Sequence, residues 1–280
     1  MSEKGLYQDK RYLSEQQYKD SSNLDARAAL HRQFSTAKIE WHPWVFDQMS
    51  LQAGSRVLEC GCGPGWLWRY NLEKIPPDCH ITLTDLSPGM VAEAEAALAE
   101  SSHHFSFEAV NVEELPFADE QFDLVIANHM LYHVPDRAKA LREIRRVLKD
   151  NGLSPRRNGS RLLAATNGQK HMQEIKNYRA QLFSEQGNAP QSLSLSLPFR
   201  LENGRELLAP FFSKVELRQY EDSLQVTEAA PLVAYILSIL NRNEVSDDTL
   251  HSLTNVLEQE LLDNDSIHIS KESCLFVAYP

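Results

Sequence analysis

The chain has 280 residues, of which 42% are hydrophobic and 24% charged, which is ordinary for a globular protein with one α/β domain and an elaboration. Its formal net charge of −11 argues against nucleic acid as a partner, because phosphate binding draws on clustered Lys and Arg. No apolar run approaches the roughly 20 residues that span a bilayer, and the four cysteines fit neither a disulfide framework nor a zinc site, so we expect a cytoplasmic protein without a membrane span.

The first fifty residues predict two helices. Ser22–Asp25 has the pattern of a capping box, and apolar residues then repeat at helical spacing as far as Phe34. A second helix is expected over Trp41–Met49, with a proline tolerated in its first turn. One face of these helices must therefore pack on the rest of the protein.

A short apolar strand, Arg56–Cys60, runs directly into a turn with three alternating glycines. These are Gly61, Gly63 and Gly65. Glycine serves where the backbone needs a positive φ or where a ligand approaches closely, and we expect a side chain at either of the first two to occupy the space of a nucleotide. A helix from Trp66 and a second strand, Ile81–Asp85, complete a βαβ unit, so the turn is predicted to bind a ligand.

Four more strands follow the second one. They are predicted over Phe105–Val110, Phe122–Ala127, Arg161–Thr166 and Lys214–Tyr220, with a last strand over Cys274–Tyr279 closing the chain. Ser87, Asp136 and Ser246 are each placed to cap a helix. Further helices are expected over Met172–Gln186 and Ala229–Leu240, and the second of these is short and apolar enough to be a buried cap or a dimer surface. His103 and His104 lack a third ligand, so no metal site is predicted.

These motifs resemble the class I S-adenosylmethionine (SAM)-dependent methyltransferases, of the methyltransferase type 11 or UbiE-like group that acts on small molecules. Val57–Gly65 is similar to the first motif of that family, and Asp85 to the acid that binds the ribose hydroxyls. Asn111–Phe117 resembles the segment whose first two residues face the adenine, although the family more often has Asp at its first position. Phe122–His129 resembles the fourth strand, whose end borders the methyl-transfer site. The close resemblance covers Leu51 to about Asn167.

The resemblance implies an α/β fold with a Rossmann-like seven-stranded sheet and helices on both faces. We expect residues 1–50 to form a helical lid, 51–168 the SAM-binding core, 169–245 a cap insert with the sixth strand, and 246–280 the helix and strand that complete the core. Compared with the family, residues 153–159 are an insertion in an exposed loop, to which we assign no function.

SAM is the cofactor that the resemblance implies. Its expected binding residues are Glu59, Gly61, Gly63, Gly65, Asp85, Leu86, Met90, Asn111, Val112 and Asn128. Glu59 would order the turn or meet the amino group of SAM, and Met90 fits core packing equally well. In the lid, three residues could reach the SAM carboxylate or the acceptor: Tyr18, Arg27 and His31.

Methyl transfer from a sulfonium depends mainly on positioning and desolvation, but some acceptors must also lose a proton. His129 and His133 follow the fourth strand, so we name both as candidate catalytic bases, with a structural role as the alternative for each.

The predicted function is therefore transfer of a methyl group to the O, N or C atom of a small, partly apolar metabolite. Aromatic residues outside the cofactor motifs are expected to enclose that acceptor: Trp41, Trp44, Phe183, Phe199, Phe211, Phe212 and Tyr235. Two alternatives remain open, namely a noncatalytic SAM-binding partner subunit and a dinucleotide-dependent oxidoreductase, although the latter favours a G-x-G-x-x-G turn. A homodimer is also left open.

Overall fold

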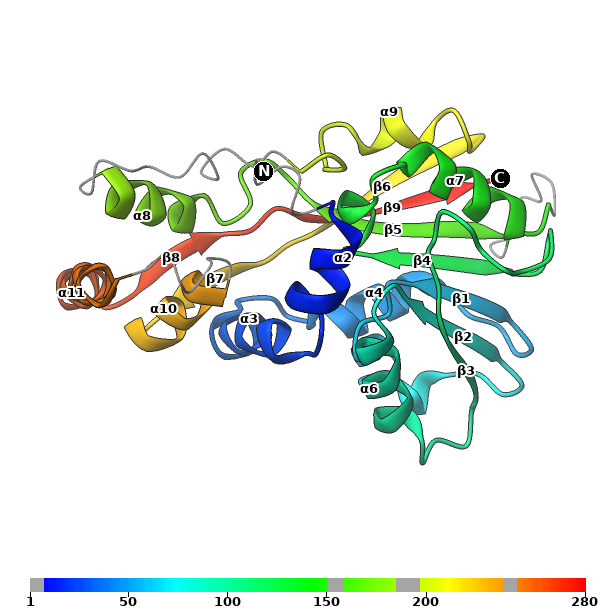
Figure 1. Cartoon of the computed structure of the whole chain (residues 1–280), viewed down its shortest axis with the longest axis horizontal. Coiled ribbons are helices and arrows are strands. Elements are labelled where there is room, and N and C mark those ends of the chain that lie inside the picture. The colour runs from blue at the N-terminus through cyan, green and yellow to red at the C-terminus, as the bar shows by residue number, and fades with distance from the viewer. Residues whose placement is uncertain (1–7, 151–158, 185–196, 239–245) are drawn as a thin grey trace.

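The structure is a computed structural model that describes residues 8–150, 159–184, 197–238 and 246–280 (Figure 1). Within these ranges, a seven-stranded sheet has the order β3-β2-β1-β4-β5-β9-β6. The first five strands are parallel, and β9 lies antiparallel between β5 and β6. The strands are β1 Arg56–Cys60, β2 His80–Asp85, β3 His104–Ala109, β4 Leu124–Asn128, β5 Arg161–Asn167, β6 Lys214–Tyr220 and β9 Ser273–Tyr279. This order confirms the predicted Rossmann-like sheet.

Helices precede, connect and follow these strands. In chain order they are α2 Lys10–Tyr12, η1 Leu13–Gln17, α3 Ser22–Phe34, α4 Trp41–Met49, α5 Trp66–Arg69, η2 Leu72–Lys74, α6 Pro88–Leu98, η3 Leu131–His133, α7 Arg137–Val147, α8 Gln173–Ser184, α9 Gly204–Leu208, α10 Ala229–Ser238 and α11 Asp247–Asn264. The predicted caps of α6, α7 and α11 are confirmed, because Ser87, Asp136 and Ser246 each accept a backbone N–H of the first turn. The capping box at Ser22 is wrong: this residue already lies inside α3, and its hydroxyl donates to Asp20.

The alternation of side chains along the strands divides the core between the two faces of the sheet. On one face, Leu58 and Val125 pack against α7 and α9. On the other face, Val57 and Ile126 pack against α4, α5 and α6. Both faces are therefore covered by helices, as a mostly parallel sheet requires. A ligand can bind at the carboxyl-terminal edge of the sheet, where the parallel strands end.

A second lobe, which the sequence analysis did not separate from the core, lies beyond that edge (Figure 1). It consists of an antiparallel pair, β7 Ser223–Val226 and β8 Ile267–Ser270, packed with α3, α8, α10 and α11. Only two residues separate β6 from β7, and only two separate β8 from β9. Each of these two segments, β6-β7 and β8-β9, therefore runs from the main sheet into the second lobe. Buried residues of α11, such as Leu253 and Leu257, belong to the core of the second lobe and not to the main sheet.

The expected insertion at 153–159 falls almost entirely outside the described residues, as does the end of the predicted helix Met172–Gln186. Among the helices in the described part of the chain, none has the length and apolar character that crossing a bilayer requires.

Candidate active site

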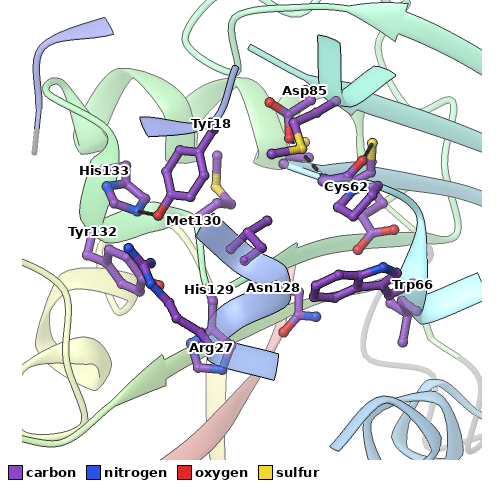
Figure 2. Close-up of a pocket in the computed structure, with 18 of the residues that line it drawn as sticks. Tyr18, Arg27, Cys62, Trp66, Asp85, Asn128, His129, Met130, Tyr132 and His133 are labelled. Carbon is purple, nitrogen blue, oxygen red and sulfur yellow. Dashed lines mark hydrogen bonds between the residues drawn. The ribbon is translucent and has the colours of Figure 1, made fainter. Parts of the chain in front are cut away.

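The glycine turn and the end of β2 are held together by backbone hydrogen bonds and by one carboxylate. The amides of Gly61 and Cys62 donate to the carbonyl oxygen of Thr84, at 2.7 and 2.9 Å. Asp85 accepts the amide of Gly63 on one oxygen, at 3.0 Å, and the amide of Ser87 on the other, at 2.9 Å. Asp85 thus fixes the turn in addition to facing the cavity beside it (Figure 2).

Positive φ, one of the two reasons expected for these glycines, is confirmed. Gly61 and Gly63 have φ of 72° and 53°, which L side chains rarely adopt. A Cβ at Gly61 would also lie 2.7 Å from the Cβ of Met130, so this residue excludes a side chain there as well. At Gly63 the nearest atom to an added Cβ is 3.9 Å away, so backbone conformation is the constraint there.

Glu59 is a buried acid behind the turn. Its side chain accepts the indole N–H of Trp68 at 2.7 Å. Burial raises the pKa of Glu59 to about 8, against the effect of this hydrogen bond, and the charge of Asp85 raises it further. Glu59 is therefore protonated in most molecules at neutral pH.

One cavity of about 570 Å³ extends from the glycine turn to the second lobe. Nine of the ten expected cofactor residues line it: Glu59, Gly61, Gly63, Asp85, Leu86, Met90, Asn111, Val112 and Asn128. Gly65 does not line the cavity and packs against Ala94 of α6 instead. Asn128 also accepts the indole N–H of Trp41 at 3.2 Å, which ties α4 to the end of β4.

The N-terminal strap, residues 9–21, covers the cofactor end of this cavity. Lys10 pairs with Glu113 at 2.5 Å, and the amide of Ser21 donates to Glu93 at 3.2 Å. Between these contacts, the hydroxyl of Tyr18 is hydrogen-bonded to Nε2 of His133 at 3.0 Å, as Figure 2 shows. The strap is therefore fastened to three separate elements around the turn.

The two candidate bases lie in different surroundings. His133 faces the strap through Tyr18, whereas His129 has a ring 4.9 Å from that of Trp41 and a φ of 58°. Burial lowers the pKa of His129 to about 3, with smaller contributions from His42, Lys271 and His133. A neutral imidazole with so low a pKa is a poor proton acceptor near neutral pH.

The predicted enclosure of the acceptor by aromatic residues is only partly correct. Trp41 and Tyr235 line the cavity, but Phe199, Phe211 and Phe212 pack on the main sheet with α9. Trp44 contacts the opposite face of the sheet. The structure describes the backbone of Phe183 but not its side chain.

The other end of the cavity contains residues that the sequence analysis missed. There Lys271 forms an ion pair with Asp222, with side-chain exposures of 8% and 1%. Asp222 lies in the turn between β6 and β7, and Lys271 lies in the turn between β8 and β9. Charged residues in turns are ordinarily solvated, so the local sequence does not predict that these two are buried. Asn167 and His171 line the same end, and so does His31, which was expected to reach the SAM carboxylate or the acceptor.

All four cysteines lie in the described part of the chain, where they are free and buried. Among the described residues, no cluster of three or more His, Cys, Asp or Glu side chains has the arrangement of a metal site.

The region around the glycine turn is similar in sequence to known proteins. Residues 58–154 match a family described as a methyltransferase domain. The chain is 34% identical over 115 residues to a demethylmenaquinone methyltransferase of Listeria monocytogenes, which is 41% of this chain and 48% of the relative. It is 37% identical over 102 residues to the highly reducing polyketide synthase verA of Penicillium polonicum, which is 35% of this chain and 4% of the synthase. The chain thus spans about half, or much less, of the length of these relatives.

A solved structure agrees with the fold over a longer stretch. The phosphoethanolamine N-methyltransferase 2 of Haemonchus contortus, solved with S-adenosylhomocysteine, superimposes with a TM-score of 0.55 and 17% identity, covering 98% of this chain and 60% of that one. Identity at this level shows a shared fold.

Proposed function

We propose that this chain, whose residues 58–154 match the methyltransferase domain family, transfers a methyl group from SAM to a small, partly apolar metabolite. The observation that carries the proposal is a glycine turn tied to Asp85, at one end of a single cavity that continues past His133 into the second lobe. The named activity of the demethylmenaquinone methyltransferase, a relative over the same region, supports it.

The residues at the turn fit SAM. A carboxylate offers about four acceptor sites, and the two backbone amides on Asp85 leave about two of these for the paired hydroxyls of a ribose. Met90 and Val112 supply buried apolar walls for a flat base, and Asn111 supplies polar atoms at its edge. When bound, SAM brings an electrophilic methyl group on a sulfonium, so the protein has to position the acceptor and exclude water.

Where the acceptor must lose a proton, we assign the base role to His133. Its hydrogen bond with Tyr18 fixes the ring at the boundary between the two ends of the cavity. His129 is the weaker candidate because its pKa is low, and its contact with Trp41 suits a wall of the acceptor end.

The other functions considered are less well supported. The matched family and the methyltransferase relative do not favour a noncatalytic subunit or an oxidoreductase, and the glycine spacing disagrees with a dinucleotide turn. Three further statements remain predictions. The net charge of −11 favours an acceptor other than nucleic acid, and the four free thiols favour a cytosolic location. The third is a homodimer.

The test combines binding with product detection. Calorimetry should show binding of SAM and S-adenosylhomocysteine and none of NAD. The protein is then incubated with a metabolite extract and SAM that carries a deuterated methyl group, and mass spectrometry should find a product that contains the label. A heat-inactivated sample is the control. Preference for NAD would contradict the cofactor, and SAM binding without any labelled product across extracts would favour the noncatalytic subunit.

A further inference from the structure

Four residues at the second-lobe end of the cavity come together where β5 ends beside the turn between β8 and β9. Asn167 is paired with Ser273 across the sheet, and the hydroxyl of Ser273 donates to the amide oxygen of Asn167 at 3.0 Å. The amide of Glu272 donates to Nδ1 of His171 at 3.1 Å. Lys271 immediately precedes Glu272. Residues 271–273, where β8 leads into β9, thus hold all three side chains, because Lys271 belongs to this stretch, Glu272 binds His171 and Ser273 binds Asn167. All three line the cavity.

These residues have hydrogen-bond donors left for a ligand. Because Nδ1 of His171 accepts a backbone N–H, a neutral ring carries its proton on Nε2, which makes no hydrogen bond within the described part of the chain. The amide oxygen of Asn167 is likewise occupied by Ser273, which leaves its NH₂ group. The ammonium of Lys271 has three protons, and among the described residues it donates to Asp222 and lies 5.8 Å from the centre of the Tyr220 ring.

The acceptors in the same place are largely used. One oxygen of Asp222 accepts the hydroxyl of Ser35 at 2.7 Å and the amide of Ala37 at 3.2 Å, and the other accepts Lys271. Both oxygens of Asp222 are therefore occupied, whereas Asn167, His171 and Lys271 keep donors that a ligand can use.

The net charge there is close to zero. Lys271 and Asp222 neutralise each other. Burial lowers the pKa of His31 to about 3 and that of His171 well below its ordinary value, and the charge of Lys271 acts in the same direction, so both rings are neutral at pH 7. A ligand carboxylate at Lys271 would bring a second buried anion beside Asp222, and Arg27, a cation on α3 that also lines the cavity, donates its hydrogen bonds to Ser238 instead.

We infer that the methyl acceptor carries an uncharged carbonyl oxygen, which binds at this donor cluster, defined as Lys271 Nζ, His171 Nε2 and the amide nitrogen of Asn167. A carbonyl oxygen donates no hydrogen bond, adds no charge and accepts through two lone pairs, so it can accept from two of the three donor groups at a time. This inference rests on the proposed function, since it names the acceptor group for the same cavity.

Matched probes test the chemistry of the ligand. The protein, saturated with S-adenosylhomocysteine, is titrated with acetophenone, benzoate and ethylbenzene, and dissociation constants are measured by saturation-transfer NMR. We expect acetophenone to bind about three- to tenfold more tightly than ethylbenzene, the range for one net hydrogen bond, and more tightly than benzoate. Equal binding of acetophenone and ethylbenzene would overturn the inference, and preference for benzoate would show an anion site instead.

Two substitutions locate the effect. Asn167→Asp keeps the size of the side chain but replaces a donor by an acceptor, and His171→Leu removes a donor; both should abolish the preference for acetophenone. His171→Gln, which retains an N–H at similar reach, should preserve part of it. Retained S-adenosylhomocysteine binding shows that each variant is folded. A preference unchanged in both variants would exclude the cluster, whereas failure of the unmodified protein to bind S-adenosylhomocysteine would overturn the proposed function along with this inference.

Discussion

At the scale of single residues, Asp85 has two roles that a substitution can separate. It holds the glycine turn through Gly63 and Ser87, and it has acceptor sites left for the ribose. We expect Asp85→Ala to raise the dissociation constant of S-adenosylhomocysteine by about 10- to 100-fold, because hydrogen bonds to charged groups contribute roughly 1.5–3 kcal/mol. Asp85→Asn, which keeps one oxygen, should lose less. Calorimetry measures both, with exposed Asp119→Ala as the control; an unchanged constant in Asp85→Ala would mean that the ribose is held elsewhere.

Glu59 makes the stability of the ligand-free protein depend on pH. Its pKa is raised to about 8 by burial, so in the range between its ordinary value of 4.5 and 8 the folded chain keeps a proton that the unfolded chain has released. This contribution to the free energy of unfolding is fully present below 4.5 and is lost as the pH rises through 8.

Glu59→Gln should therefore gain stability relative to the unmodified protein as the pH is raised from about 5 to about 8, by on the order of 3–4 kcal/mol. Urea unfolding of both proteins at each pH measures the difference, in which contributions from other groups cancel. A difference that stays constant with pH would show that Glu59 is ionised throughout this range.

At the scale of elements, the N-terminal strap depends on a glycine that the sequence analysis did not single out. A Cβ at Gly89, in the first turn of α6, would lie 2.1 Å from the carbonyl oxygen of Lys19. Alanine favours helix, so Gly89→Ala would not weaken α6 by itself, but it should displace the strap.

We expect Gly89→Ala to weaken S-adenosylhomocysteine binding by about tenfold, since the strap covers that end of the cavity, and to speed trypsin cleavage after Lys19. Gly159→Ala is the matched control, because no atom lies within 4 Å of a Cβ there and its φ is not positive. Unchanged binding and cleavage in both variants would mean that the strap contributes nothing to cofactor retention.

The same elements show what the sequence could predict. Strands β1 to β6 and β9 were located closely because β1, β4, β5 and β9 are short apolar runs, and β2, β3 and β6 largely alternate apolar with polar residues. The cofactor end followed from glycines and acids that are adjacent in sequence to these strands. The second lobe was missed because β7 and β8 have only four residues each and lie 40 residues apart in the chain. Likewise, Asp222 and Lys271 are ordinary turn residues whose meeting depends on the pairing of those strands. The roles given to Phe199 and Phe212 failed because composition does not tell which face of the sheet an aromatic residue covers.

At the scale of the whole molecule, the ion pair between Lys271 and Asp222 joins the β6-β7 segment to the β8-β9 segment where both leave the main sheet. Lys271→Met should lower the free energy of unfolding by about 3 kcal/mol, because it leaves a buried carboxylate unpaired. Adding Asp222→Asn should recover more than half of that loss, since an amide oxygen still accepts from Ser35 and Ala37.

Urea unfolding of the two single variants and the double variant completes this cycle. Lys139→Met, in a pair with exposed Glu114, is the control and should cost less than about 1 kcal/mol. Losses that simply add in the double variant would show that the two buried charges do not stabilise each other.

The packing of α3 also has a consequence for the time at which the protein becomes complete during synthesis. Leu30 and Phe34 are buried against residues that come as late as Ile267 and Ile269. On the ribosome, the strands that carry the glycine turn emerge far earlier than this partner surface does. Domains generally fold as they emerge, so the first helix of the second lobe has to wait, with its apolar face exposed, while most of the chain is translated. A nascent chain stalled before residue 267 would therefore be a better client for chaperones that bind apolar helices than the released protein.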